Sequence, residues 1–397
     1  MEDTLQIITY LQLFLIVFWV IIIISIVSSI ILMYYYFFYF TKVSNYSINK
    51  TNENTPKVSV IICAKNEEHQ LRQNIRKILL QDYLDWELIL VNDESTDNTW
   101  TIMNDIANNH NMVKLINIEN KPKDWRGKKY ALLQGIKAAQ GDWILLTDAD
   151  CQVTSAVWIR LMMQPSSYSD IILGYAPYKA NPTWLNKIIR AETYYTALLY
   201  MSAGLHLQPY MSVGRNVAYR KAIIEAKYFE AIKHSQSGDD DLLIQQIQQK
   251  YKVSVCTDEA SFVYSAAPNT FALWWQQKRR HLSTARKYSL HSLVYISVFN
   301  LAVFTSVVSS FGIFIFTIFN IEIVFFNSYY FLLALALLFI AIGYLDMIKM
   351  DGIRTRMIKQ LNGEPQIGLL HYFLYLTLHS ITPFLPEEKI SKWRKKK

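Results

Sequence analysis

Two aspartates directly follow an apolar run in the middle of the chain. Asp148 and Asp150 come immediately after residues 143–147. Two carboxylates at positions i and i+2 beyond a strand can reach one hard cation together, and Mg²⁺ and Mn²⁺ prefer oxygen ligands that they share with substrate phosphates. A polar turn after a strand explains the same residues, because short motifs often match by chance. The pair alone is therefore a weak indication of a site for Mg²⁺ or Mn²⁺.

Two further groups of acids strengthen this indication. Asp93 follows another apolar run, and Asp239, Asp240 and Asp241 precede an apolar helical pattern. An Asx-type turn or a helix N-cap accounts for acids at such places. However, like charges packed together are unfavourable unless a cation or a proton relieves them. One of the three consecutive acids could then serve as a general base.

The elements around these acids are predicted to alternate between strand and helix. Apolar and β-branched runs predict strands at 58–64, 86–91, 113–118 and 143–147. Helical spacing of apolar residues predicts helices at 69–80, 98–109 and 128–140. This alternation indicates an α/β domain with a parallel sheet covered by helices. Ligands of such sheets bind at the carboxyl ends of the strands, where the polar clusters 65–68, 92–97 and 148–150 all fall.

Composition narrows the class of protein. Apolar residues make up 52% of the 397 residues and collect near the two ends of the chain. The three cysteines, Cys63, Cys151 and Cys256, form no CxxC pair, so neither a disulfide framework nor a thiolate metal site is expected. Much of the net charge of +8 lies beside the apolar segments, which favours membrane and phosphate partners over nucleic acid. No nucleic-acid-binding motif is apparent.

The N-terminal region 1–41 is predicted to be a transmembrane anchor. Its apolar run 5–32 is long enough for one span, and the aromatic tract 34–40 suits the membrane interface. A signal peptide would begin with basic residues and end at a small-residue cleavage site. The chain instead begins Met1-Glu2-Asp3, which favours an uncleaved anchor.

The second apolar region, 291–350, predicts two more transmembrane helices, at 293–319 and 328–348. The basic tail 351–397 contains a weaker apolar stretch, 367–384. That stretch could span, re-enter or lie in the interface, and an amphipathic interfacial position is favoured.

Basic residues flank these spans on one side. The first span is followed by Lys42, Lys50 and Lys57. The second span is preceded by Arg279, Arg280, Arg286 and Lys287, and the third is followed by Lys349, Arg354, Arg356 and Lys359. Because positive charge marks the cytoplasmic side, the N-terminus is predicted outside. The polar linker 42–55 then leads to a cytoplasmic domain, 56–290.

Seven segments of that domain resemble the motifs of glycosyltransferase family 2, in the family's order and approximate spacing. They are Val60–Glu68, Val91–Asp93, Gly127–Leu132, Asp148–Asp150, Gly214–Arg220, Gly238–Leu242 and Gln277–His281. Each segment is weak by itself, but seven in register are a strong signal. The resemblance implies inverting transfer on a GT-A fold, a Rossmann-like mixed sheet with helices on both faces. The membrane pattern is similar to that of membrane-bound members such as polysaccharide synthases.

The resemblance also implies roles for single residues. It places the donor contacts as follows: Glu67 and Asp93 at the base, Asp148 at the ribose, Lys128 near the diphosphate, and Gln277, Arg280 and His281 closing over it. It places the metal at Asp150, with Asp148 beside it. Asp240 would be the catalytic base, and Asp239 would stand where the family has glutamate. A third acid follows, so the base could also be Asp241.

Together these features predict a membrane-anchored glycosyltransferase, in a bacterial inner membrane, that uses Mg²⁺ or Mn²⁺ and a nucleotide-sugar donor, with a UDP-sugar favoured. The acceptor would be a lipid, a lipid-linked molecule or a glycan. A processive polysaccharide synthase is one alternative, but the family's Gln-x-x-Arg-Trp ends here in His281, which puts polymer synthesis in doubt. A catalytically inactive nucleotide-binding scaffold is the other, and crowded carboxylates without a function are hard to explain in it.

Overall fold

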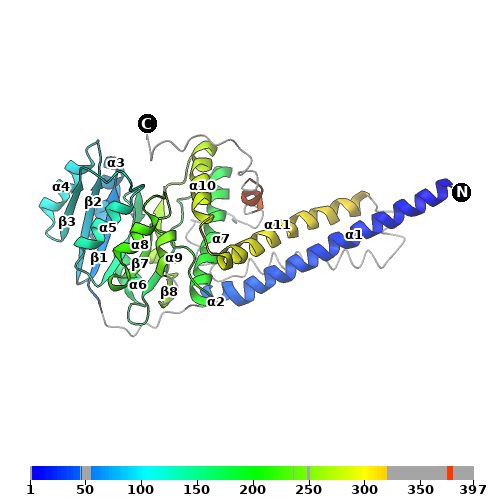
Figure 1. Cartoon of the computed structure of the whole chain (residues 1–397), viewed down its shortest axis with the longest axis horizontal. Coiled ribbons are helices and arrows are strands. Elements are labelled where there is room, and N and C mark those ends of the chain that lie inside the picture. The colour runs from blue at the N-terminus through cyan, green and yellow to red at the C-terminus, as the bar shows by residue number, and fades with distance from the viewer. Residues whose placement is uncertain are drawn as a thin grey trace.

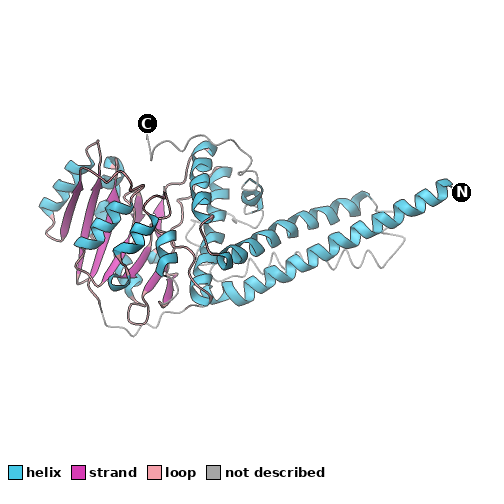
Figure 2. Ribbon diagram, in the orientation of Figure 1, coloured by secondary structure: helices cyan, strands magenta, loops and turns pink. Residues whose placement is uncertain are grey.

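A computed structural model describes residues 2–44, 46, 55–235, 237–247, 251–319 and 373–378 of the chain. The predicted third span, 328–348, lies outside the described residues, as do most of the linker 42–55 and most of the tail 351–397. Within the stretch 367–384, residues 373–378 are helical. The described part is an α/β domain from which two long helices extend (Figures 1 and 2).

The first half of the domain is a parallel sheet. Strand β1 (Val58–Ala64) pairs with β2 (Trp86–Asp93) on one side and with β4 (Trp143–Leu146) on the other, and β3 (Val113–Ile118) pairs with β2. Four predicted strands are thereby confirmed. Strand β2 runs two residues further than predicted, so Asp93 is its last residue rather than part of the following turn.

The sheet is mixed rather than parallel as the alternation of strands and helices predicted, because a strand in its second half runs in the opposite direction to its neighbours. Strand β7 (Val217–Arg220) is antiparallel to β4 and to β6 (Ile171–Gly174), and β8 (Val253–Cys256) is parallel to β6. The seven-stranded sheet therefore has the order β3-β2-β1-β4-β7-β6-β8. A separate two-stranded sheet joins β5 (Cys151–Val153) to β9 (Val263–Ser265) directly after the Asp148–Asp150 motif.

Helices cover both faces of the sheet because successive strand residues point to opposite sides. Ile61 and Ile144 face a core shared with α5 (Lys129–Ala138), α8 (Ala226–Ile232) and α9 (Asp241–Ile247). Val60 and Leu145 face the opposite core, formed with α3 (Glu68–Leu79), α4 (Thr99–Asn109) and α6 (Trp158–Met163). Short 3₁₀ turns at Lys221–Ile223 and Glu259–Ser261 complete the connections.

Two long helices leave the domain side by side (Figure 1). Helix α1 (Glu2–Tyr34) continues through a π-helix (η1, Tyr35–Phe40) into α2 (Thr41–Ser44), and its partner is α11 (Leu290–Phe319). Hydrogen bonds join them: Ser28 Oγ lies 2.7 Å from Thr305 Oγ1, and the Tyr35 hydroxyl donates to the Tyr295 carbonyl at 2.6 Å. The segments Ile16–Val43 and Leu290–Ile313 are long and apolar enough to cross a membrane.

The ends of these helices that lie nearest the domain are part of its hydrophobic core. Tyr35 and Phe299 belong to the same buried cluster as helix α7 (Trp184–His206). Helix α10 (Phe271–Ala285) precedes α11, and its Lys278 forms a buried ion pair with Glu192 of α7. The helix that carries the Gln277–His281 motif is thus tied to α7 and leads into α11.

Candidate active site

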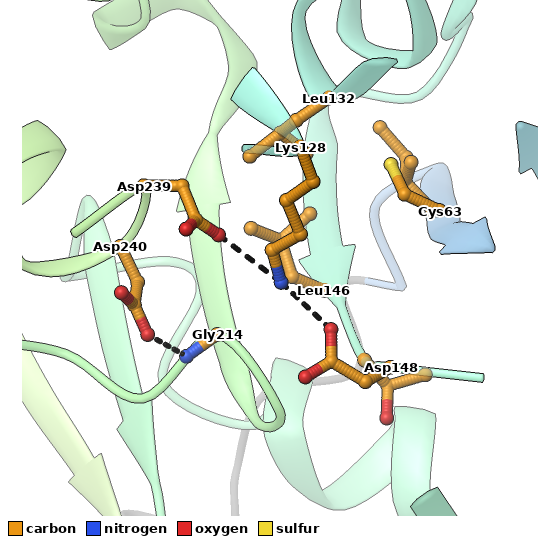
Figure 3. Close-up of a pocket in the computed structure, with 10 residues that line it drawn as sticks. Cys63, Lys128, Leu132, Leu146, Asp148, Gly214, Asp239 and Asp240 are labelled. Carbon is orange, nitrogen blue, oxygen red and sulfur yellow. Dashed lines mark hydrogen bonds and ion pairs between the residues drawn. The ribbon is translucent and has the colours of Figure 1, made fainter. Parts of the chain in front are cut away.

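Lys128 lies at the centre of a small cavity at the carboxyl end of β4. Its ammonium group is 2.7 Å from Asp148 Oδ1 and 3.1 Å from Asp239 Oδ2 (Figure 3). Asp148 follows β4, Lys128 directly precedes α5, and Asp239 lies just before α9. Asp240 and Gly214 also line the cavity. Three segments that are distant in sequence therefore meet at one cation.

The charges of this cluster reinforce one another. Burial lowers the pKa of Lys128, but the carboxylates of Asp148, Asp239 and Asp240 outweigh it and raise that pKa well above its usual range. Burial alone would raise the pKa of Asp239, and Lys128 with Lys129 reverses this, so the pKa of Asp239 is lowered. Lys128 and Asp239 are therefore both charged near neutral pH.

Asp240 is held by backbone amides. Its Oδ2 accepts from the Gly214 N–H at 2.6 Å, and its Oδ1 accepts from the Asp241 N–H at 3.0 Å. A Cβ at Gly214 would lie 3.1 Å from Asp240 Oδ2, so a glycine permits this close approach. Burial and the neighbouring Asp239 charge raise the pKa of Asp240. A carboxylate with a raised pKa at a cavity wall is suited to accept a proton.

Asp241 does not line the cavity, and it contacts Tyr288, just before α11. The Tyr288 hydroxyl donates to its Oδ2 at 2.8 Å, and its buried Oδ1 has no hydrogen-bond partner among the described residues. Burial, followed by the Asp240 charge, raises the pKa of Asp241 well above its usual range. The three consecutive acids thus have three different environments, and Asp239 and Asp240 are the two that line the cavity.

Asp148, Asp150 and Cys151 form a cluster that fits a divalent cation. One ligand atom from each lies within 4.8 Å of the others. Cys151 is buried, and burial raises the pKa of its thiol well above its usual range. The thiol therefore stays protonated and donates to Asp150 Oδ1 at 3.6 Å. The carboxylate oxygens, which Mg²⁺ and Mn²⁺ prefer, remain as the available ligands.

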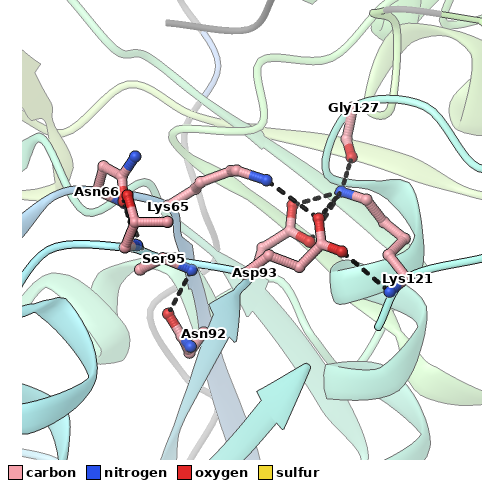
Figure 4. Close-up of polar contacts among 9 residues, drawn as sticks. Lys65, Asn66, Asn92, Asp93, Ser95, Lys121 and Gly127 are labelled. Carbon is pink, nitrogen blue, oxygen red and sulfur yellow. Dashed lines mark hydrogen bonds and ion pairs between the residues drawn. The ribbon is translucent and has the colours of Figure 1, made fainter. Parts of the chain in front are cut away.

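A second polar cluster surrounds Asp93 at the end of β2. Lys121 Nζ lies 2.8 and 2.9 Å from its two carboxylate oxygens and also donates to the Gly127 carbonyl at 3.0 Å (Figure 4). Glu94, which has a φ of 56°, accepts from Lys65 Nζ at 3.1 Å. Lys121 lies outside all the sequence motifs, and only its position in the fold identifies it.

Glu67 lies beside this cluster, directly before α3. Its side chain is largely buried, and its backbone N–H donates to Thr99 Oγ1 at 2.8 Å. The neighbouring Asn66 has a φ of 56°, and its Oδ1 accepts from the Thr96 N–H at 2.7 Å. These bonds join the loops after β1 and β2, so Glu67 and Asp93 lie at the same edge of the sheet.

Helix α10 packs against the turn that carries the three acids. Ser237 Oγ lies 2.7 Å from Thr284 Oγ1 and donates to the Arg280 carbonyl at 3.1 Å. Gln277 Nε2 donates to the Tyr178 hydroxyl at 3.0 Å, and His281 is exposed. The Gln277–His281 motif is thereby brought next to the acids, and Tyr178 is a contact that the motifs did not predict.

Comparisons with known proteins give matches to two family models. Residues 59–226 match the family model for "Glycosyl transferase family 2", and residues 143–345, more than half of the chain, match that for "Glycosyl transferase family group 2". The probable glycosyltransferase YdaM of Bacillus subtilis is 28% identical over 233 residues, which are 57% of this chain and 54% of that protein.

A second relative and one solved structure extend the comparison. The undecaprenyl-phosphate 4-deoxy-4-formamido-L-arabinose transferase of Proteus mirabilis is 30% identical over 182 residues, 44% of this chain and 52% of that protein. The chain therefore spans about half the length of these two relatives. A mannosyltransferase from Pyrobaculum calidifontis, solved with GDP-Man and Mn²⁺, superposes with a TM-score of 0.51 at 16% identity, over 87% of this chain and 99% of that one. This likeness shows a shared GT-A fold.

Proposed function

Because the chain belongs to glycosyltransferase family 2 and is a glycosyltransferase, we propose that it transfers a sugar from a nucleoside diphosphate sugar to a lipid, lipid-linked or glycan acceptor, with inversion, at the cytoplasmic face of a membrane. The observation that carries the proposal is Lys128 held between Asp148 and Asp239, with Asp240 in the same cavity. This is one cation among three acids, beside a pair of carboxylates that suits a metal ion.

The residues divide the chemistry as follows. Asp240 takes the proton of the acceptor hydroxyl while that oxygen bonds to the anomeric carbon, and the bond from that carbon to the diphosphate breaks in the same step. Lys128 turns from the carboxylates to the leaving diphosphate and neutralises its charge. Because the attack is direct, no enzyme nucleophile is required, and the sugar's anomeric configuration inverts.

The nucleoside end of the donor lies at the neighbouring strand. Asp93, oriented by Lys121, and Glu67 contact the base, and Asp148 contacts the ribose. Asp150 and Asp148 hold the divalent cation, which when bound stabilises the negative charge of the leaving diphosphate. Gln277 and Arg280 of α10 close over the diphosphate. Transfer of these roles rests on the family motifs, and the cavity supports them by bringing the acids and Lys128 together.

A membrane location is part of the proposal. Helices α1 and α11 are long and apolar enough to span a membrane. The residues Tyr35 and Phe299, near the domain, join its hydrophobic core. A lipid-borne acceptor hydroxyl would then approach Asp240 from the membrane side. The P. mirabilis relative is named for undecaprenyl phosphate, which supports a lipid or lipid-linked acceptor for this chain.

The test is release of nucleoside diphosphate by the purified full chain in detergent. UDP-, GDP- and dTDP-sugars are offered with Mn²⁺ or Mg²⁺, with and without bacterial lipid extract. We expect metal-dependent release from one donor, lost in Asp150→Ala and Asp240→Asn and kept in the control Asp105→Ala, which changes an exposed acid of α4. Equal release by Asp240→Asn would refute the assignment of the base, and no release from any donor by the folded chain would refute the function.

A further inference from the structure

The segment Gly214–Arg220 matches a family motif, yet the candidate site described above uses only its first residue, Gly214. Two of its side chains are structural. Arg220 forms an ion pair with Asp170 at 3.0 Å and stacks on Trp143. Asn216 is fully buried, and its side chain bonds to the Trp158 indole N–H and to two backbone carbonyls. These contacts anchor β7 at both of its ends.

Arg215, next to Asn216, is half-buried like Arg220, but its contacts lie beside the candidate site. Its guanidinium carbon lies 4.5 Å from the centroid of the Tyr178 ring, and its Nη1 donates to Ser265 Oγ. Ser265 pairs with Cys151 in the small β5–β9 sheet. Arg215 is therefore tied to the residue that directly follows Asp150.

The neighbours of Arg215 belong to several parts of the candidate site. Asp150 and Asp148 lie within electrostatic range of its guanidinium, and so does His281 of α10. The preceding residue, Gly214, holds Asp240 through its backbone N–H. Tyr178, on which Arg215 stacks, accepts a hydrogen bond from Gln277. Arg215 thus lies among Asp148–Asp150, the proposed base Asp240 and helix α10.

We propose that Arg215 binds the sugar of the donor, with its guanidinium N–H groups donating to oxygen substituents of that sugar. This inference rests on the proposed function, which requires the sugar to lie between the diphosphate at Asp148–Asp150 and the base Asp240. A guanidinium offers five N–H donors in a planar fork, and one of them is used on Ser265. The Tyr178 ring and the anchored start of β7 fix its orientation before the donor binds, so little entropy is lost on binding.

The test separates the sugar from the nucleotide. Binding of UDP, UDP-glucose, UDP-N-acetylglucosamine, GDP and GDP-mannose to the full chain in detergent with Mn²⁺ is measured by titration calorimetry. In Arg215→Gln we expect the Kd of the nucleotide sugar that the wild type binds to rise about tenfold or more, the usual effect of losing a charged hydrogen-bond donor. The Kd of the matching nucleoside diphosphate should change less than about twofold.

Two further variants complete the test. Arg215→Lys keeps the charge without the fork, and we expect the same selective loss of sugar binding. Arg72→Gln changes an exposed arginine of α3 and should leave both Kd values unchanged.

An equal rise in Kd for nucleotide and nucleotide sugar would mean that Arg215 binds the diphosphate, and unchanged values for both would mean a structural role. Either result overturns the inference and leaves the proposed function standing. A wild-type chain that binds none of the five ligands would instead contradict the proposed function for UDP- and GDP-sugars, and the inference with it.

Discussion

Replacing Lys128 by methionine removes the cation that links Asp148 and Asp239. Methionine keeps the length and most of the volume of the side chain, so the cavity wall is preserved. The exposed fractions of the three side chains are 17% for Lys128, 31% for Asp148 and 15% for Asp239. Leaving a fully buried charge unpaired costs about 3–5 kcal/mol. Since water reaches these groups, we expect a loss of about 1–3 kcal/mol in the free energy of unfolding at neutral pH.

The loss should depend on pH in a defined direction. The pKa of Asp239 is lowered in the folded chain, first by Lys128. Its ion pair therefore stabilises the fold above the unfolded pKa of about 3.9, and this contribution disappears as the pH falls through the folded value. The pKa of Lys128 is raised, so its own contribution is complete below about pH 10.4 and is lost only at higher pH. The variant should thus be weakest relative to wild type between about pH 5 and pH 10.

The assay is thermal melting of the full chain in detergent at several pH values. A loss of about 1–3 kcal/mol corresponds to a decrease of roughly 2–12 °C in Tm for a domain of this size. The matched control is Lys137→Met, which changes an exposed lysine of α5, the helix that Lys128 directly precedes. Mn²⁺ should raise the Tm of Lys128→Met more than that of wild type, because Asp148 no longer has a competing ammonium group. Equal melting of the two variants, or a loss that is the same at about pH 2 as at about pH 7, would refute the reasoning.

Four other predictions concern activity and binding. Asp240→Asn should reduce kcat by about 10²–10⁴-fold, measured by nucleoside diphosphate release. In the same assay, the kcat of Asp241→Asn should stay within about tenfold of wild type. Similar losses in both variants would contradict the distinction between these acids. The pKa of Asp240 is raised above the ordinary aspartate value of 3.8. The ratio kcat/KM should therefore fall as the pH decreases through a value above 3.8. A pH profile that is flat down to that value would be inconsistent with Asp240 as the base. Tyr288→Phe removes the donor to Asp241 and should cost about 1–3 kcal/mol of stability, seen as a lower Tm with an unchanged donor KM. Lys121→Met should weaken nucleotide binding about tenfold through loss of the contact that orients Asp93, and calorimetry with UDP or GDP checks this.

Local patterns account for much of the domain. The β-branched run 58–64 and the run 113–118 form strands with the predicted bounds, because buried parallel strands need continuous apolar residues. Asp148 and Asp150 follow β4 as expected, whereas Asp93 is the last residue of β2. The two apolar helices that the structure describes lie where apolar length places them. The antiparallel direction of β7 was not predicted, since Val217–Arg220 is too short to carry a directional signal.

The sequence by itself determined which residue types are available at the strand ends, because strand, helix and membrane propensities depend on neighbours along the chain. Only the tertiary structure separated the three consecutive acids, since Asp239 meets Lys128, Asp240 meets the Gly214 amide, and Asp241 meets the Tyr288 hydroxyl. Each partner lies 26 or more residues away. Such contacts arise where separate segments meet at one end of the sheet, and the charges and burial found there, rather than local spacing, set the pKa of each carboxyl group.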